Sequence, residues 1–147
     1  MDYIKELERD FPNAMSNVYC GAYIGKGWIP AVREALAVLE AAGAKVAQIK
    51  EKFGGLRLYW DSPDLEVGAR PFSVWHYIAC SMAEKQAEAK CWKICEDCGQ
   101  PGVIRNSGWI RTLCDSCAIP KGKKKVNGTT EAATGNQNSS SETKAEE

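Results

Sequence analysis

The stretch that decides the fold runs from residue 44 to residue 60 and reads AKVAQIKEKFGGLRLYW. Gly54 and Gly55 interrupt it, and two consecutive glycines can take the positive backbone angles that a two-residue hairpin turn demands. With these glycines as the loop, the predicted cross-strand pairs are Phe53–Leu56, Lys52–Arg57, Glu51–Leu58, Lys50–Tyr59 and Ile49–Trp60. One face of this hairpin is then mostly apolar, with Glu51 as the exception.

The other face of the predicted hairpin is cationic and aromatic. It carries Lys50, Lys52, Arg57 and Tyr59. Placing Lys52 directly opposite Arg57 would cost about a few tenths of a kcal/mol or more. A functional interpretation explains this cost: the face is a small platform for phosphate and a stacked base. The alternative is a solvated sheet face that nearby acidic residues neutralise, namely Asp61, Asp64 or Glu66.

Helical patterns flank the hairpin on both sides. Ile4, Leu7 and Phe11 recur at helical spacing before Pro12, which predicts a short first helix. A second helix is predicted over residues 30–42, with Gly43 as its stop. A third should follow Pro71 and run to about residue 90. Its predicted inward residues are Phe72, Trp75, Ala79, Met82 and Ala83, and its predicted outward residues are Glu84, Lys85 and Glu88. The sequence therefore predicts a small α+β domain over residues 1–90, in the order helix, helix, hairpin, helix.

Two cysteine pairs follow the third helix. Cys95 and Cys98 have two residues between them, as do Cys114 and Cys117, and 15 residues separate the pairs. This spacing is typical of four-thiolate zinc sites, because each tight turn points two sulfurs at one ion. Four thiolates leave no open coordination position, so the predicted Zn²⁺ is structural and stabilises a module over residues 91–120. A disulfide framework is a weaker interpretation because seven cysteines cannot all pair, and an iron–sulfur cluster is the other metal alternative.

The segments between and around these cysteines add two expectations. Residues 99–113 contain Pro101-Gly102 and Ser107-Gly108 among apolar residues, which predicts a second short hairpin. Cys20, Cys80 and Cys91 have no partner motif, and Cys80, on a helix with apolar neighbours, is expected to be a buried, inert thiol.

Charge is unevenly distributed along the 147 residues, although 19 basic and 19 acidic side chains cancel overall. Residues 1–89 have a net charge of -2, residues 90–125 have +5, and residues 126–147 have -3. Residues 121–147 are expected to form a disordered tail, first basic and then acidic, because Val126 is their single large apolar residue after the lysines. The simplest role for that tail is to keep the protein soluble.

Two resemblances extend this interpretation. The elements CEDCGQPG and GWIRTLCDSC, with Trp109 and Leu113 before the second cysteine pair, resemble the treble-clef zinc finger of GATA-type DNA-binding domains. Pro120 and Gly122 follow almost at once, so the helix that such domains lay in the major groove would be a single turn here. More widely, EKFGGLRLYW together with the cysteine elements resembles small uncharacterised zinc-finger proteins encoded by bacteriophages and prophages. This likeness implies a phage-encoded accessory protein, whose module is a treble clef or a zinc ribbon.

A catalytic function is not expected from this sequence. His76 is its single histidine, and the His-x-Glu element of zinc deaminases is absent, since Tyr77 and Ile78 follow it. No stretch approaches the roughly 20 apolar residues of a membrane span, and the polar start is unlike a secretory signal, so a cytoplasmic protein without a membrane partner is expected.

Nucleic acid is the first partner that the sequence predicts, and a host protein is the alternative. The predicted nucleic-acid contacts are Lys50, Lys52, Arg57, Tyr59, Arg105, Trp109, Arg111, Lys121, Lys123, Lys124 and Lys125. The host-protein alternative uses the zinc module and exposed aromatic residues as a rigid interface that modulates or inhibits a host enzyme or defence factor.

Overall fold

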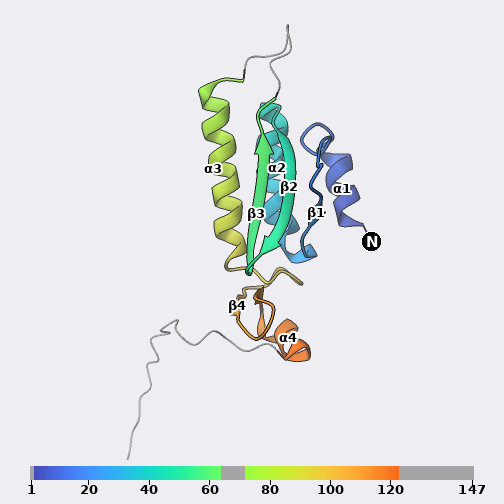
Figure 1. Cartoon of the computed structure of the whole chain (residues 1–147), viewed down its shortest axis with the longest axis vertical. Coiled ribbons are helices and arrows are strands. Elements are labelled where there is room, and N and C mark those ends of the chain that lie inside the picture. The colour runs from blue at the N-terminus through green and yellow to red at the C-terminus, as the bar shows by residue number, and fades with distance from the viewer. Residues whose placement is uncertain (1, 64–71, 123–147) are drawn as a thin grey trace, which may run out of the picture.

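The protein combines helices with two small sheets (Figure 1), over the residues that this computed structural model describes, 2–63 and 72–122. The helices are α1 (Tyr3–Asp10), α2 (Ile29–Ala42), α3 (Val74–Cys91) and α4 (Asp115–Ala118), with short 3₁₀ turns at Lys26–Trp28 and Ile119–Lys121. The strands are β1 (Ala22–Tyr23), β2 (Lys45–Lys52), β3 (Gly55–Asp61), β4 (Val103–Arg105) and β5 (Arg111–Leu113). This mixture agrees with the predicted α+β class. None of the described helices is long and apolar enough to cross a membrane.

The three predicted helices are present, and local capping sets their ends. Asp2 caps α1, since its side chain accepts a hydrogen bond from a backbone N–H of the first turn. α2 ends at Gly43, whose φ of +80° is the left-handed conformation that favours glycine. Ser73 caps α3 together with His76, whose Nδ1 accepts from the Ser73 N–H at 3.0 Å. The single histidine therefore belongs to a helix cap.

The hairpin between β2 and β3 turns one residue earlier than predicted. Its turn residues are Phe53 and Gly54, with φ of +53° and +81°, both left-handed as a two-residue hairpin turn requires. Gly55 lies in β3 instead, where the Trp92 ring packs so closely that a Cβ would lie 2.5 Å from its Cζ2. The observed pairs are Lys52–Gly55, Glu51–Leu56, Lys50–Arg57, Ile49–Leu58 and Gln48–Tyr59. The predicted register, with Lys52 opposite Arg57, is therefore wrong.

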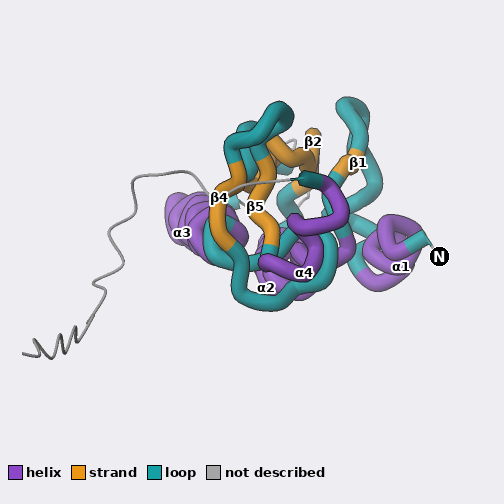
Figure 2. Tube along the Cα trace, turned by 90° about the horizontal axis from the view of Figure 1, so that it is seen from below, coloured by secondary structure: helices purple, strands orange, loops and turns teal. Residues whose placement is uncertain are grey.

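Helices cover one face of the larger sheet, which has the strand order β1-β2-β3. Figure 2 shows α1, α2 and α3 on one side of the strands, and none of the helices in the described ranges lies on the other. The main core fills the space between these layers, where Leu36 and Leu39 of α2 pack with Ile49 of β2 and Leu58 of β3. We refer to the opposite face of the sheet as its open face.

The orientation of α3 differs from the prediction. Trp75, Ala79 and Met82 point outward, whereas the buried positions are Cys80, Ala83, Ala87 and Cys91. Small side chains on this face let α3 pack closely against α2, which also buries alanines. Two acids predicted to face water instead accept hydrogen bonds from residues of β3. Glu84 accepts one from Trp60 Nε1 at 2.9 Å, and Glu88 accepts one from the Leu58 N–H at 3.4 Å.

Candidate metal centre and nucleic-acid interface

Four cysteine sulfurs converge below the hairpin turn, as the spacing predicts. The Sγ atoms of Cys95, Cys98, Cys114 and Cys117 all lie within 4.8 Å of one another, and those of Cys98 and Cys114 are 3.6 Å apart. A tetrahedral zinc ion with Zn–S bonds of about 2.3 Å would place its sulfurs about 3.8 Å apart. The four thiols can therefore bind a metal ion such as zinc.

Backbone geometry brings the two cysteine pairs together. Gly99, with φ of +82°, closes the first turn by donating to the Cys95 carbonyl at 2.9 Å. Strands β4 and β5 pair as the predicted second hairpin and lead to Cys114, which occupies the N-cap position of α4. Cys117 lies in α4, only four residues long, so the predicted single-turn helix is confirmed.

The thiols of the cluster differ in acidity. Burial disfavours the Cys95 thiolate, but backbone N–H groups of Cys114, Cys98 and Asp97 outweigh burial and lower its pKa to about 7. The neighbouring Cys114 side chain raises the pKa of Cys117 to about 12. Four thiolates at this separation repel one another, and a bound divalent cation removes that repulsion.

The cysteine module docks on the helix-and-sheet layer through glycines. Gly27 donates its N–H to the Glu96 carbonyl at 2.8 Å, and a Cβ on Gly27 would lie 2.1 Å from the Cys95 carbonyl oxygen. Trp28, fully buried, donates from Nε1 to the Ile94 carbonyl at 2.9 Å. The first cysteine turn therefore contacts backbone that only glycine permits.

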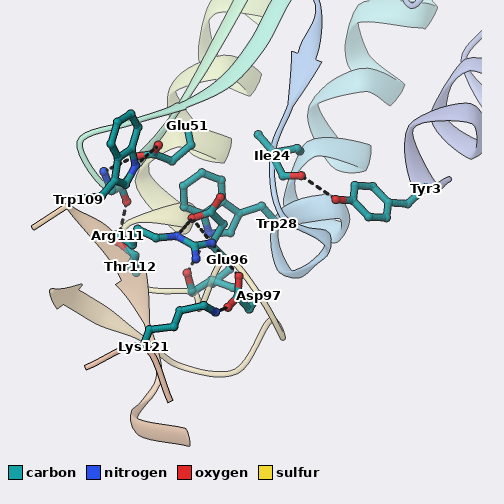
Figure 3. A network of polar contacts seen from close by, with 12 residues as sticks. Tyr3, Ile24, Trp28, Glu51, Glu96, Asp97, Trp109, Arg111, Thr112 and Lys121 are labelled. Atoms are coloured by element: carbon teal, nitrogen blue, oxygen red, sulfur yellow. Dashed lines mark hydrogen bonds and ion pairs between the residues drawn. The ribbon is translucent and has the colours of Figure 1, made fainter. Parts of the chain in front are cut away.

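A polar network joins the hairpin turn to the module (Figure 3). The Thr112 hydroxyl, fully buried, donates to the Gly54 carbonyl at 2.6 Å, and Trp109 Nε1 donates to a Glu51 carboxylate oxygen at 3.1 Å. Arg111 bonds both Glu96, at 3.0 Å, and Asp97, at 2.7 Å. These contacts fix the β4–β5 hairpin against the tip of the β2–β3 hairpin.

The two acids of this network respond differently to their surroundings. Burial raises the pKa of Glu96 despite its bond to Arg111. Burial also acts on Asp97, but hydrogen bonds from Lys121 and Arg111 outweigh it and lower the pKa of that carboxyl.

The predicted cations of the module are held by carboxylates. Arg105 is only 5% exposed and bonds the Leu113 carbonyl at 3.1 Å and Asp115 at 2.7 Å. Arg111 has the acidic partners described above, and Lys121 is ion-paired with Asp97. The remaining predicted cations of this segment, Lys123, Lys124 and Lys125, lie outside the described residues. The +5 net charge of residues 90–125 therefore overstates the cationic surface around the cysteines.

The hairpin cations lie on the open face of the sheet, as predicted. Lys50 pairs in register with Arg57 on one side and with Tyr23 of β1 on the other. Each cation of the first pair also contacts an aromatic ring: Lys50 lies 5.6 Å from the centroid of the Tyr59 ring, and Arg57 lies 6.0 Å from that of Trp92. A hollow of about 670 Å³ beside these residues is lined partly by Tyr59, Lys50 and Tyr19.

Of the three acidic residues that could neutralise this face, Asp61 is the one within the described ranges. Asp61 lies at the far end of β3 and accepts from the Tyr19 hydroxyl at 3.3 Å, and Asp64 and Glu66 are outside the described ranges. Across residues 2–63 and 72–122, Lys50, Lys52 and Arg57 form no ion pair with a carboxylate.

Three residues that contribute to these surfaces are not predicted from the sequence. Tyr23 is 72% exposed, but it lies in a stretch with no strand pattern of useful length. The predicted register has Phe53 in a strand, because either Phe53-Gly54 or Gly54-Gly55 can form a two-residue turn. Gly27 gives no signal on its own, since its role depends on a segment about 70 residues away in the chain.

The other cysteines are separate from the metal centre. Cys80 and Cys91 are fully buried in the main core, and burial raises the pKa of both thiols, that of Cys91 to about 12. This confirms that Cys80 is buried. Cys20 is exposed and lies two residues before β1.

Comparison with known proteins gives no matching family model, no matching curated protein and no matching solved structure.

Proposed function

We propose that this protein is a non-catalytic, zinc-stabilised protein that binds single-stranded nucleic acid on the open face of its β1-β2-β3 sheet. The observation that carries this proposal is the row Tyr23, Lys50 and Arg57 across the sheet, with Tyr59 beside it. Aromatic rings stack on bases whatever their sequence, and cations between the rings contact phosphates. Because Arg105, Arg111 and Lys121 are paired with acids, the sheet face is the stronger candidate of the two predicted surfaces.

The cysteine module supports this proposal as a structural element. We propose that it is a zinc-bearing treble clef, since one cysteine pair lies in a turn and the other at the start of α4, with β4 and β5 between them. Four thiolates would leave the zinc ion no position for a substrate or water. With four residues, α4 is too short to fill a major groove, which favours single strands over duplex DNA.

The test measures the salt dependence of binding to a short fluorescent single-stranded oligonucleotide. Replacing Lys52 and Arg57 together by alanine removes two phosphate contacts, so the slope of log affinity against log salt should decrease by about 1.4. The matched control replaces Lys5 and Lys90, two exposed lysines of the helix layer, by alanine. It removes the same charge and should leave the slope unchanged. Equal effects of the two variants would contradict a specific sheet-face site.

A second candidate function has its own observation. α3 exposes apolar side chains to solvent, with Val74, Trp75, Tyr77, Ile78 and Met82 all at least 40% exposed. Such a surface suits a protein partner, as the host-protein alternative requires. The test is purification from host cells: a stoichiometric protein that survives nuclease treatment and is lost in Trp75→Glu would favour this function. Under either proposal, the resemblance to phage-encoded zinc-finger proteins supports an accessory role in the cytoplasm of a bacterial host.

A further inference from the structure

A groove of about 430 Å³ lies between the tip of the β2–β3 hairpin and the loop that joins β4 to β5. Its lining residues are Lys50, Glu51, Lys52, Phe53, Gly108, Trp109 and Ile110. This volume lies within the range of about 300 to 1,000 Å³ that is typical of small-molecule sites. Phe53 and Trp109 are 65% and 72% exposed, so two large rings contribute to the lining of a groove that is open to solvent.

Phe53 also has a strained backbone conformation. Its φ of +53° is left-handed, which a bulky side chain rarely adopts and which asparagine or glycine would take more easily in this turn. Folding alone does not favour phenylalanine here, because its ring is mostly in solvent. Strained positions of this kind concentrate at binding sites.

The groove also has a polar side. Glu51 accepts one hydrogen bond on each carboxylate oxygen, from the Gly54 N–H at 2.7 Å and from Trp109 Nε1 at 3.1 Å. These bonds hold the carboxylate and the indole in place, and each oxygen retains a lone pair for a further donor. On the opposite side of β2, Lys50 and Lys52 also line the groove and can contact phosphate.

We infer that this groove binds one unpaired nucleobase that carries an exocyclic amine, stacked between Phe53 and Trp109, with the amine donating to Glu51. This inference rests on the proposed single-strand function and adds a base preference to it. Cytosine presents its N4 amine to a carboxylate, whereas uracil presents the O4 carbonyl oxygen at the same position. The strand bends from the sheet face into the groove, and Lys50 borders both surfaces.

The experiment compares two homopolymeric strands, oligodeoxycytidylate and oligodeoxyuridylate, whose bases differ in this exocyclic group. Fluorescence anisotropy with the full-length protein should give an affinity for the cytidylate strand that is on the order of tenfold higher. Glu51→Gln should remove this preference, because an amide can also donate to uracil. Trp109→Leu should weaken cytidylate binding about tenfold by removing one stacking surface.

The matched control is Trp75→Leu, which removes another exposed tryptophan, on α3 and outside the groove. It should leave both affinities unchanged, and thermal melting of each variant checks that it folds. Equal affinity for the two strands, with no effect of Trp109→Leu, would overturn the groove inference while the sheet-face function stands. Failure of the protein to bind either strand would overturn the proposed function itself.

Discussion

Replacing Phe53 by asparagine should stabilise the protein and weaken its binding to single strands. A left-handed φ costs a bulky residue about 1.5 kcal/mol, and asparagine avoids most of that cost because its short side chain bonds locally. The substitution also removes the contact between Lys52 and the Phe53 ring, 5.5 Å to its centroid, which at an exposed site contributes about 0.5 kcal/mol. The difference predicts a net gain of about 1 kcal/mol.

The gain corresponds to a rise in melting temperature of roughly 4 °C for a domain of this size. Calorimetry or circular dichroism measures it, and anisotropy with the cytidylate strand measures binding, which should fall about tenfold as one stacking ring is lost.

Phe53→Leu is the matched control for this substitution. Leucine keeps an apolar side chain in the strained conformation but has no ring, so it should weaken binding without raising the melting temperature. A destabilised Phe53→Asn protein would refute the strain argument. A stabilised Phe53→Asn protein with unchanged affinity would show instead that the ring has no part in binding.

The remaining predictions concern the module and its attachment. Cys98→Ser should release the metal ion and unfold the module; full zinc content with unchanged stability would show that the ligand assignment is wrong. Thr112→Val leaves the Gly54 carbonyl without its buried donor, so urea denaturation should show a loss of about 1 to 3 kcal/mol, and a loss near zero would mean that the module docks without this bond. Because the pKa of Asp97 is lowered in the folded state, its ion pairs stabilise the protein above the unfolded-state pKa of about 4 and are lost as the pH falls through the lower folded value. Asp97→Asn should therefore be less stable than the parent at pH 7, with a difference that shrinks below about pH 4; a constant difference would exclude the ion pairs as its cause.

The hairpin shows why a face can be predicted when a register cannot. Moving the turn from Gly54-Gly55 to Phe53-Gly54 changes each cross-strand partner by two residues. Side chains two apart along a strand point to the same side, so Lys50, Lys52, Arg57 and Tyr59 stay together under either register. The local sequence allows either turn, and the contact between Gly55 and the Trp92 ring, which lies far along the chain, forms only in the folded protein.

The cysteine cluster could be predicted from the sequence, whereas the pairing of the nearby cations could not. Spacing within each Cys-x-x-Cys turn is local, so the approach of four sulfurs could be predicted from the sequence. The partners of Arg105 and Arg111 are carboxylates brought close by the β4–β5 hairpin and by the docked first cysteine turn. A count of charges along the chain treats such cations as available when the fold has already paired them.

The inward face of α3 could not be predicted from periodicity, because apolar residues lie all around the helix. Tertiary packing selected the side with small residues, which lets α3 approach α2 closely and leaves Trp75 in solvent. This result gives the host-protein alternative its strongest support, since a tryptophan exposed on a helix gains most from a partner that buries it.

The four-cysteine cluster and the groove are connected through a few bonds, so a metal ion bound by the cysteines would also affect the groove. Trp109 belongs to the loop between β4 and β5, and the strands of that loop lead directly to the second cysteine pair. The Thr112 bond to Gly54 and the Glu51 bond to Trp109 set the loop beside the hairpin turn. A metal ion that orders the four cysteines therefore also orders one wall of the groove, whereas the sheet face depends on the main core. Removing the metal should for this reason abolish base preference before it abolishes the salt-dependent binding of a single strand.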